Sequence, residues 1–201
     1  MNPLSIAIGF IPLTVFALIV NWLPLGWAAA VGLAVAVVII AVTAARGGVK
    51  ILSVAQLVTL AAFTVVGFTA GSAATAFAPY ARGAASLALG AFILATSFSF
   101  PFTAQFARRS VPQQYWKSPQ FLGVNRRISL AWGLAVLAIG AGHLAAAYVG
   151  SGSAVFRLLL DWGVPAFAAY RAYSVTKRTI AQNAHTPHLD GTHRPAVASA
   201  H

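Results

Sequence analysis

Three ionisable side chains fall close together in the last apolar hairpin predicted for this 201-residue chain. His143 lies near the end of one apolar run, and Asp161 lies seven residues into the next, beyond the short loop 150–153. Arg157 precedes Asp161 by four residues, so a helix places both on one face. With Asn21, these residues form a polar set suited to binding a small solute or a lipid head group. His143 and Asp161 are also the residue types that make proton relays in membranes.

A structural role for the same residues is the plainest interpretation. A carboxylate inside a membrane span is costly and is normally paired, and Asp161 is the only acidic residue within an apolar run. An ion pair with Arg157 would neutralise it near the membrane surface and stabilise the last helix. Three interpretations therefore stay open: the ion pair, the binding site and the proton relay.

Catalytic groups are scarce in the rest of the chain. There is no Cys and no Glu, and Asp161 is the only acidic residue in an apolar run, so thiol chemistry and a carboxylate pair for magnesium within the spans are excluded. No P-loop is present. The tail histidines match no defined metal site. We therefore predict no catalytic residue, no cofactor and no metal; the remaining enzymatic alternative is a lipid-modifying enzyme with His143 as base and Asp161 as its orienting partner.

The composition is that of a membrane protein. Hydrophobic residues make up 59% of the chain and charged residues 7%, whereas soluble domains carry about 25% charged residues. The formal net charge of +11 comes from cations that lie between apolar runs, where they set topology and meet anionic head groups. We therefore predict lipids and not nucleic acid as partners.

The apolar runs are uniform on all sides, which favours lipid-embedded helices over a β-barrel. The sequence predicts an all-α integral membrane bundle over residues 1–178 and a disordered cytoplasmic tail over 179–201. The predicted transmembrane helices cover residues 4–22, 26–45, 51–71, 84–106, 127–149 and 154–175.

Lysine and arginine residues set the predicted orientation. With six spans, the strongly basic connections 46–50 and 108–127 and the tail side all fall on one side of the membrane. The other side carries only Arg82 and Arg157. We therefore expect a bacterial inner-membrane protein with both termini in the cytoplasm.

The connection after Pro101 interleaves aromatic and basic residues. This pattern is typical of a segment at the membrane surface, with rings at head-group level and cations on phosphates. It predicts either a topology anchor or a contact site for lipids, a protein partner or a second copy of the chain. The candidate contact residues are Arg108, Arg109, Tyr115, Trp116, Lys117, Arg126 and Arg127. Three polar residues of the third span, Gln56, Thr59 and Thr64, are expected to form hydrogen bonds between helices.

The chain resembles two sets of bacterial membrane proteins over residues 8–150. The first half is similar to the intracellular septation protein A family in Ile11-Pro12-Leu13-Thr14-Val15-Phe16, Ala28-Ala29-Ala30 and Val65-Val66-Gly67-Phe68. The second half resembles uncharacterised proteins often described alongside that family in Pro101-Phe102-Thr103, Gln105, Ala107-Arg108, Pro112, Trp116, Pro119, Phe121, Asn125 and Trp132-Gly133. It departs from the septation family after the third helix, where Pro79-Tyr80-Ala81-Arg82 replaces a Lys-Trp-Lys-Pro-Thr type segment.

This resemblance implies a small inner-membrane protein of the cell envelope. The leading functional hypothesis is accordingly a non-enzymatic protein that acts through protein partners or lipids in envelope maintenance. The alternative is a small-solute transporter or a substrate-binding subunit, because six helices without a motor also resemble the S component of energy-coupling-factor importers.

Overall fold

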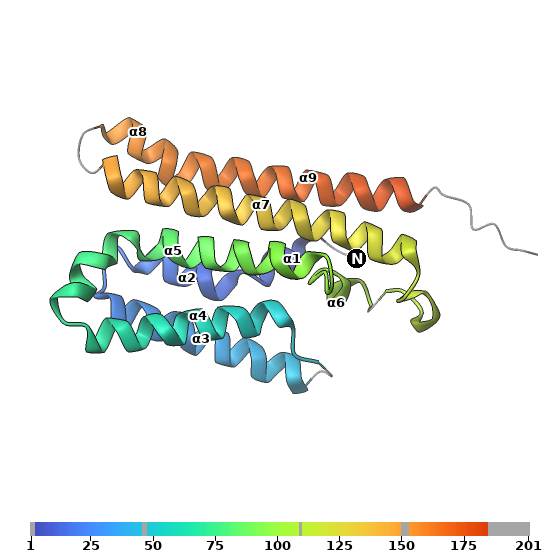
Figure 1. The fold of residues 1–201 in the computed structure, drawn as a ribbon, viewed down its shortest axis with the longest axis horizontal. Helices are drawn as coiled ribbons and strands as arrows, with labels where there is room; N and C mark the ends of the chain where they lie inside the picture. Colours follow the sequence, from blue (N-terminus) through green and yellow to red (C-terminus); the bar gives the residue numbers. More distant parts are fainter. Residues whose placement is uncertain (1–2, 46–47, 109, 150–152, 185–201) are drawn as a thin grey trace, which may run out of the picture.

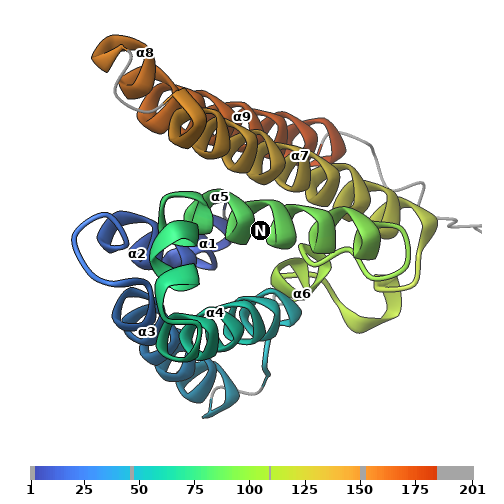
Figure 2. The ribbon, with the colours of Figure 1, turned by 60° about the vertical axis from the view of Figure 1, so that its left-hand side comes forward.

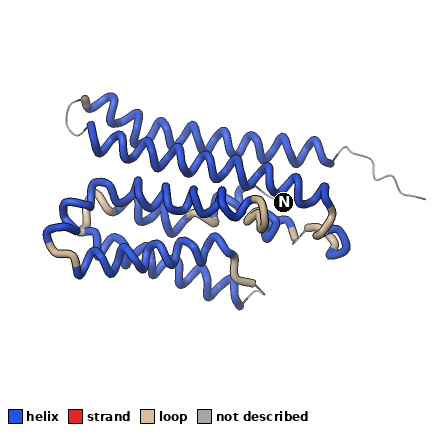
Figure 3. The backbone as a smooth tube through the Cα atoms, viewed as in Figure 1, coloured by secondary structure: helices blue, strands red, loops and turns tan. Residues whose placement is uncertain are grey.

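The computed structural model describes residues 3–45, 48–108, 110–149 and 153–184. This part of the chain is helical, with short connections and no strand among the described residues (Figure 3). Its elements are α1 (Pro3–Ile8), α2 (Ile11–Ile19), α3 (Leu25–Ala45), α4 (Ile51–Thr69), α5 (Ser72–Ser97), α6 (Ala104–Ala107), η1 (Gln113–Tyr115), α7 (Pro119–Val149), α8 (Ala154–Leu158), η2 (Leu159–Gly163) and α9 (Val164–Ala184).

The helices form a bundle of three layers (Figures 1 and 2). Helices α7, α8 and α9 make one outer layer, and α3 with α4 makes the other. Between them lie α5 and the short helices α1 and α2. The middle layer therefore meets side chains from both outer layers, and a polar group there can be enclosed.

Four helices of the described part are long and apolar enough to cross a membrane: α3, α4, α5 and α7. Many large apolar side chains on the bundle surface are exposed, including Trp27, Val58 and Leu134. An aqueous surface would not carry so much apolar area, whereas lipid favours it. The prediction of an all-helical bundle is confirmed for the described residues, and four of its helices could span a membrane.

The first predicted helix, 4–22, is broken after Ile8. Pro12 explains the break, because it has no N–H to donate and its ring clashes with the carbonyl four residues earlier in a continuous helix. Gln56 of α4 binds the groups that the break leaves free. Its Nε2 donates to the carbonyl of Gly9 at 2.8 Å, and its Oε1 accepts from the backbone N–H of Leu13 at 3.2 Å.

Gln56 thus forms the hydrogen bonds between elements that its position in a span predicts. The same expectation for Thr59 and Thr64 is wrong. Their hydroxyls donate to Ala55 and Leu60 of their own helix, at 2.9 and 2.8 Å. A short hydroxyl side chain reaches the carbonyl four residues back more easily than another helix.

The fourth span differs most from its prediction. The segment 72–83, expected as a loop, is the first half of α5, and Pro79 lies inside that helix. At the other end, α5 stops at Ser97, so Pro101 lies in the following connection and not in the helix. A proline inside a membrane helix is tolerated when neighbouring groups satisfy the freed carbonyl. The shift places Arg82 on a helix in the middle layer.

Helices α5 and α7 interlock through glycines and leucines at matching positions. Gly83 and Gly90 of α5 face Leu144 and Leu137 of α7. In return, Gly133 and Gly140 of α7 face Leu94 and Leu87 of α5. Each glycine lets the opposing leucine approach to a distance that a Cβ atom would block, so the two backbones lie close together.

The last two predicted spans are also longer than expected. Helix α7 begins at Pro119 and not at residue 127, and α9 extends to Ala184 and not to 175. Residues 179–184 of the predicted tail are therefore helical, and the remainder of that tail lies outside the described residues.

Candidate ligand-binding site

One cavity of about 390 Å³ is lined by all four site residues that the sequence predicts. Asn21 follows α2, His143 lies on α7, Arg157 on α8 and Asp161 in η2. The cavity wall is otherwise mostly apolar, formed by Phe10, Leu13, Ala17, Leu18, Trp22, Val136, Ile139, Trp162 and Pro165, with Thr14 and Ser86 as further polar members. A small set of polar groups in an apolar pocket is typical of small-molecule sites.

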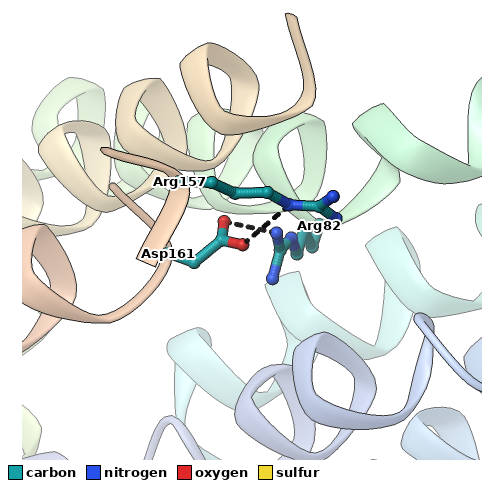
Figure 4. A network of polar contacts seen from close by, with 3 residues as sticks. All are labelled: Arg82, Arg157 and Asp161. Carbon is teal, nitrogen blue, oxygen red and sulfur yellow. Dashed lines mark hydrogen bonds and ion pairs between the residues drawn. The ribbon is translucent and has the colours of Figure 1, made fainter. Parts of the chain in front are cut away.

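A further charged residue, Arg82, also lines this cavity. It donates a hydrogen bond from Nη2 to Oδ1 of Asp161 (Figure 4). Its side chain is 7% exposed and that of Asp161 11%. The pair joins the middle layer to an outer layer in the interior of the bundle, where ionic attraction is strong because little water screens it.

The predicted Arg157–Asp161 pair is present and is the weaker of the two. Nε of Arg157 lies 3.7 Å from Oδ2 of Asp161, and the Arg157 side chain is 50% exposed. Figure 4 shows both guanidinium groups directed at the same carboxylate. Asp161 is thus held from two elements, α5 and α8, at once.

Local helix geometry explains how Asp161 reaches Arg82. Residues Leu159–Gly163 form a π-helical turn between α8 and α9. Pro165 follows it and has no N–H for the carbonyl of Asp161, four residues before. The wider turn accommodates this missing bond. Single π turns are frequent at functional sites because they redirect side chains.

His143 contributes a second polar group to the wall of the cavity. It is 6% exposed, and its Nδ1 has no hydrogen-bond partner among the described residues. The carboxylate of Asp161 is directed at the arginines, which is not the arrangement of a base and its orienting partner.

A second cavity, of about 430 Å³, adjoins the first at the arginines. Asn21, Arg82 and Arg157 line both cavities. The rest of the second wall comes from the helix ends, at Val20, Thr75, Ala78, Pro79, Ala146 and Ala147. The charged residues therefore lie between a space lined mainly by apolar side chains and a space nearer the end of the bundle.

Sequence reasoning missed Arg82, although a signal existed. Arg82 and Arg157 were the two cations on the predicted outer side, and a buried acid needs a partner. The segment around Pro79 was expected to be a loop, which separated Arg82 from the hairpin that holds Asp161. Placing Arg82 on a helix would have brought it to the same depth.

The basic connection on the opposite end is only partly a surface segment. Phe102, Phe106 and Phe121 are buried, so the expectation of rings at head-group level is wrong for these three. Thr103 anchors the segment, since its hydroxyl donates to the carbonyl of Asn125 at 2.8 Å. Gln105 accepts from the backbone N–H of Ile51 at 2.9 Å and so caps α4.

The cations of this connection differ in their contacts. Arg108 lies over the ring of Trp116 at 5.0 Å, and Arg126 donates to the carbonyl of Phe98, at the end of α5, at 2.8 Å. Tyr115, Lys117 and Arg127 have exposed side chains, and Arg109 lies outside the described residues. Contact of these residues with lipids or a partner stays a prediction.

No group of metal-ligating side chains occurs within the described ranges, and the tail histidines lie beyond them. The likeness to the septation family also stays a prediction. Comparisons of the chain with protein-family models, with curated proteins and with solved structures found no match.

Proposed function

We propose that this chain is a non-enzymatic inner-membrane protein of the bacterial cell envelope that binds a lipid or small solute in the cavity beside Asp161. The observation that supports the proposal most is the meeting of Asn21, Arg82, His143, Arg157 and Asp161 around one apolar cavity. These residues come from separate elements of the chain, and a purely structural ion pair requires no cavity beside it.

A cavity-filling substitution tests this function. Ala17 lines the cavity on α2, and Ala17→Phe places a ring in the space that a ligand would occupy. We expect wild-type protein, extracted from native membranes in a mild polymer, to retain a lipid or small molecule in native mass spectrometry. The Ala17→Phe variant should lose it.

Ala34→Phe is the matched control, because Ala34 is an exposed residue on α3 that does not line the cavity. It should retain the ligand at the wild-type level. Equal retention by the wild type and both variants would contradict the proposal, as would a wild type that retains nothing.

We further propose six membrane crossings with both termini in the cytoplasm. The crossings beyond the four long helices would be α1–α2 and α8–α9, which run alongside α5 and α7 (Figure 1). Asp161 and its arginines then lie in the half of the membrane opposite the basic connections. This follows the preference of lysine and arginine for the cytoplasmic side.

Single cysteines distinguish six crossings from four, and the chain has no native cysteine to interfere. Ser153 and Gln182 are both exposed; Ser153 directly precedes α8, and Gln182 lies in the last turn of α9. On intact cells, an impermeant maleimide should label Ser153→Cys but not Gln182→Cys. Ser110→Cys serves as the inside control. If only the four long helices cross, Ser153→Cys and Gln182→Cys will be labelled from the same side.

The identity of the ligand separates the two functional alternatives. A retained lipid favours a role in envelope maintenance. A retained water-soluble solute favours a substrate-binding subunit of a transporter, with the second cavity as its entry from the outer side.

A further inference from the structure

The charges that line the cavity do not balance. Arg82 and Arg157 face one carboxylate, Asp161, which is the only acidic residue in the described part of the chain. Asp161 already accepts a hydrogen bond from Arg82 and lies 3.7 Å from Nε of Arg157. The site therefore carries one positive charge more than its carboxylate compensates, and the half-exposed Arg157 places that charge beside an apolar space, where a counter-ion would stabilise it.

Two buried nitrogen atoms belong to residues that line the first cavity and have no hydrogen-bond partner among the described residues. Nε of Arg82 and Nδ1 of His143 lack hydrogen-bond partners within the described residues, and each residue is 6% exposed. A buried polar atom without a partner needs a physical explanation. A guanidinium group presents donors in a planar fork that fits the oxygens of a carboxylate or phosphate. Nε–H of Arg82 can only donate, so the partner that it lacks is an acceptor of the kind that an anion supplies.

The two adjoining cavities define how such a ligand would lie. The arginines are common to both, whereas the larger part of the first cavity is lined by apolar side chains of α2 and α7. Leu18, Trp22 and Trp162 on its rim are exposed on the bundle surface, so the space is bordered by side chains that lipid chains contact. Asp161 lies seven residues after the start of α8, which is about 10 Å along a helix. This depth suits a head group near the membrane surface.

We propose that the cavity binds an anionic amphiphile, with its carboxylate or phosphate group between Arg82 and Arg157 and its apolar chain along α2. This inference rests on the proposed function and names the class of ligand. Binding in this manner supplies the missing negative charge and fills the apolar space together. A neutral or zwitterionic ligand would fill the apolar space but would not supply a net negative charge.

Nanodiscs of phosphatidylcholine that contain a minor fraction of phosphatidylglycerol provide the test. The two lipids have the same chains and differ in net head-group charge. Native mass spectrometry of protein released from the discs reports which lipid is retained. We expect wild-type protein to favour phosphatidylglycerol about tenfold over its share in the disc, the effect of one hydrogen bond to a charged group.

Arg157→Gln removes the uncompensated charge at a half-exposed position and should abolish this preference while lipid is still retained. Arg171→Gln is the matched control, because Arg171 is an exposed arginine on α9 that lines neither cavity. It should keep the preference. Ala17→Phe should remove retained lipid of both kinds, which separates occupancy of the cavity from its selectivity.

Inorganic phosphate, added as a soluble competitor, distinguishes the two sources of the anion. If phosphate leaves the phosphatidylglycerol preference unchanged, the ligand is a lipid. If it abolishes the preference, the anionic chemistry is supported and the source is a free solute. Equal retention of the two lipids by wild type, or an unchanged preference in Arg157→Gln, would overturn this inference alone. A wild type that retains no ligand would instead overturn the proposed function.

Discussion

Replacing Arg82 by Gln should destabilise the bundle far more than replacing Arg157 by Gln. Arg82 donates a hydrogen bond to Asp161 in the interior, and both side chains are about nine-tenths buried. Without Arg82, Asp161 keeps only the half-exposed Arg157 at 3.7 Å, and breaking a buried ion pair costs about 3–5 kcal/mol. Arg157 is half-exposed and lies 3.7 Å from the carboxylate, so its loss should cost about 0–1 kcal/mol.

Unfolding by titration from a mild detergent into sodium dodecyl sulfate measures both effects on the free energy of unfolding. Replacing Arg82 and Asp161 together, Arg82→Leu with Asp161→Leu, removes both charges of the pair. The double variant should be more stable than Arg82→Gln, because no buried charge is left unpaired. Equal losses in Arg82→Gln and Arg157→Gln would show that Arg82 is not the principal partner of Asp161.

Gly140→Ala should also destabilise the protein, although alanine is the better helix former. A Cβ atom at Gly140 would lie 2.9 Å from the backbone nitrogen of Leu87 and 2.9 Å from its side chain. Backbone cannot move aside as a side chain can, so α5 and α7 must separate. Overpacking of this kind costs about 1–3 kcal/mol.

Gly123→Ala on the same helix is the matched control. Nothing lies within 4 Å of a Cβ atom built there, so only the helix propensity acts, and alanine should stabilise by up to about 1 kcal/mol. The same titration compares the two variants. Changes of the same sign at both positions would mean that the close approach of α5 and α7 contributes little to stability.

The sequence predicts the fold best where apolar runs are long and uninterrupted. The expected spans 26–45 and 51–71 correspond to Leu25–Ala45 and Ile51–Thr69. Proline residues account for the errors in the first and fourth predicted spans. Pro12 breaks the first span, whereas Pro79 lies inside α5. Sequence alone does not distinguish these outcomes, because they depend on which neighbours can satisfy the freed carbonyl.

Apart from Asn21, the site residues that the sequence predicts are close to one another in the chain. The Arg157–Asp161 pair follows from a spacing of four residues, and His143 follows from the shortness of the hairpin. Arg82 is 79 residues from Asp161, and its part in the site depends on the helix extending back past Pro79. The π turn at Leu159–Gly163 carries no sequence signal besides Pro165.

The distance of 79 residues between Arg82 and Asp161 has a consequence for biogenesis. Helix α5 is the least apolar of the four long helices and carries Arg82. At a synthesis rate of about 5–20 residues per second, Asp161 is synthesised about 4–16 s after Arg82. We therefore expect secure insertion of α5 into the bilayer to depend on the synthesis of the C-terminal hairpin. A nascent chain that stops before Asp161 would present an unneutralised arginine to the translocon and to the proteases that remove failed membrane proteins.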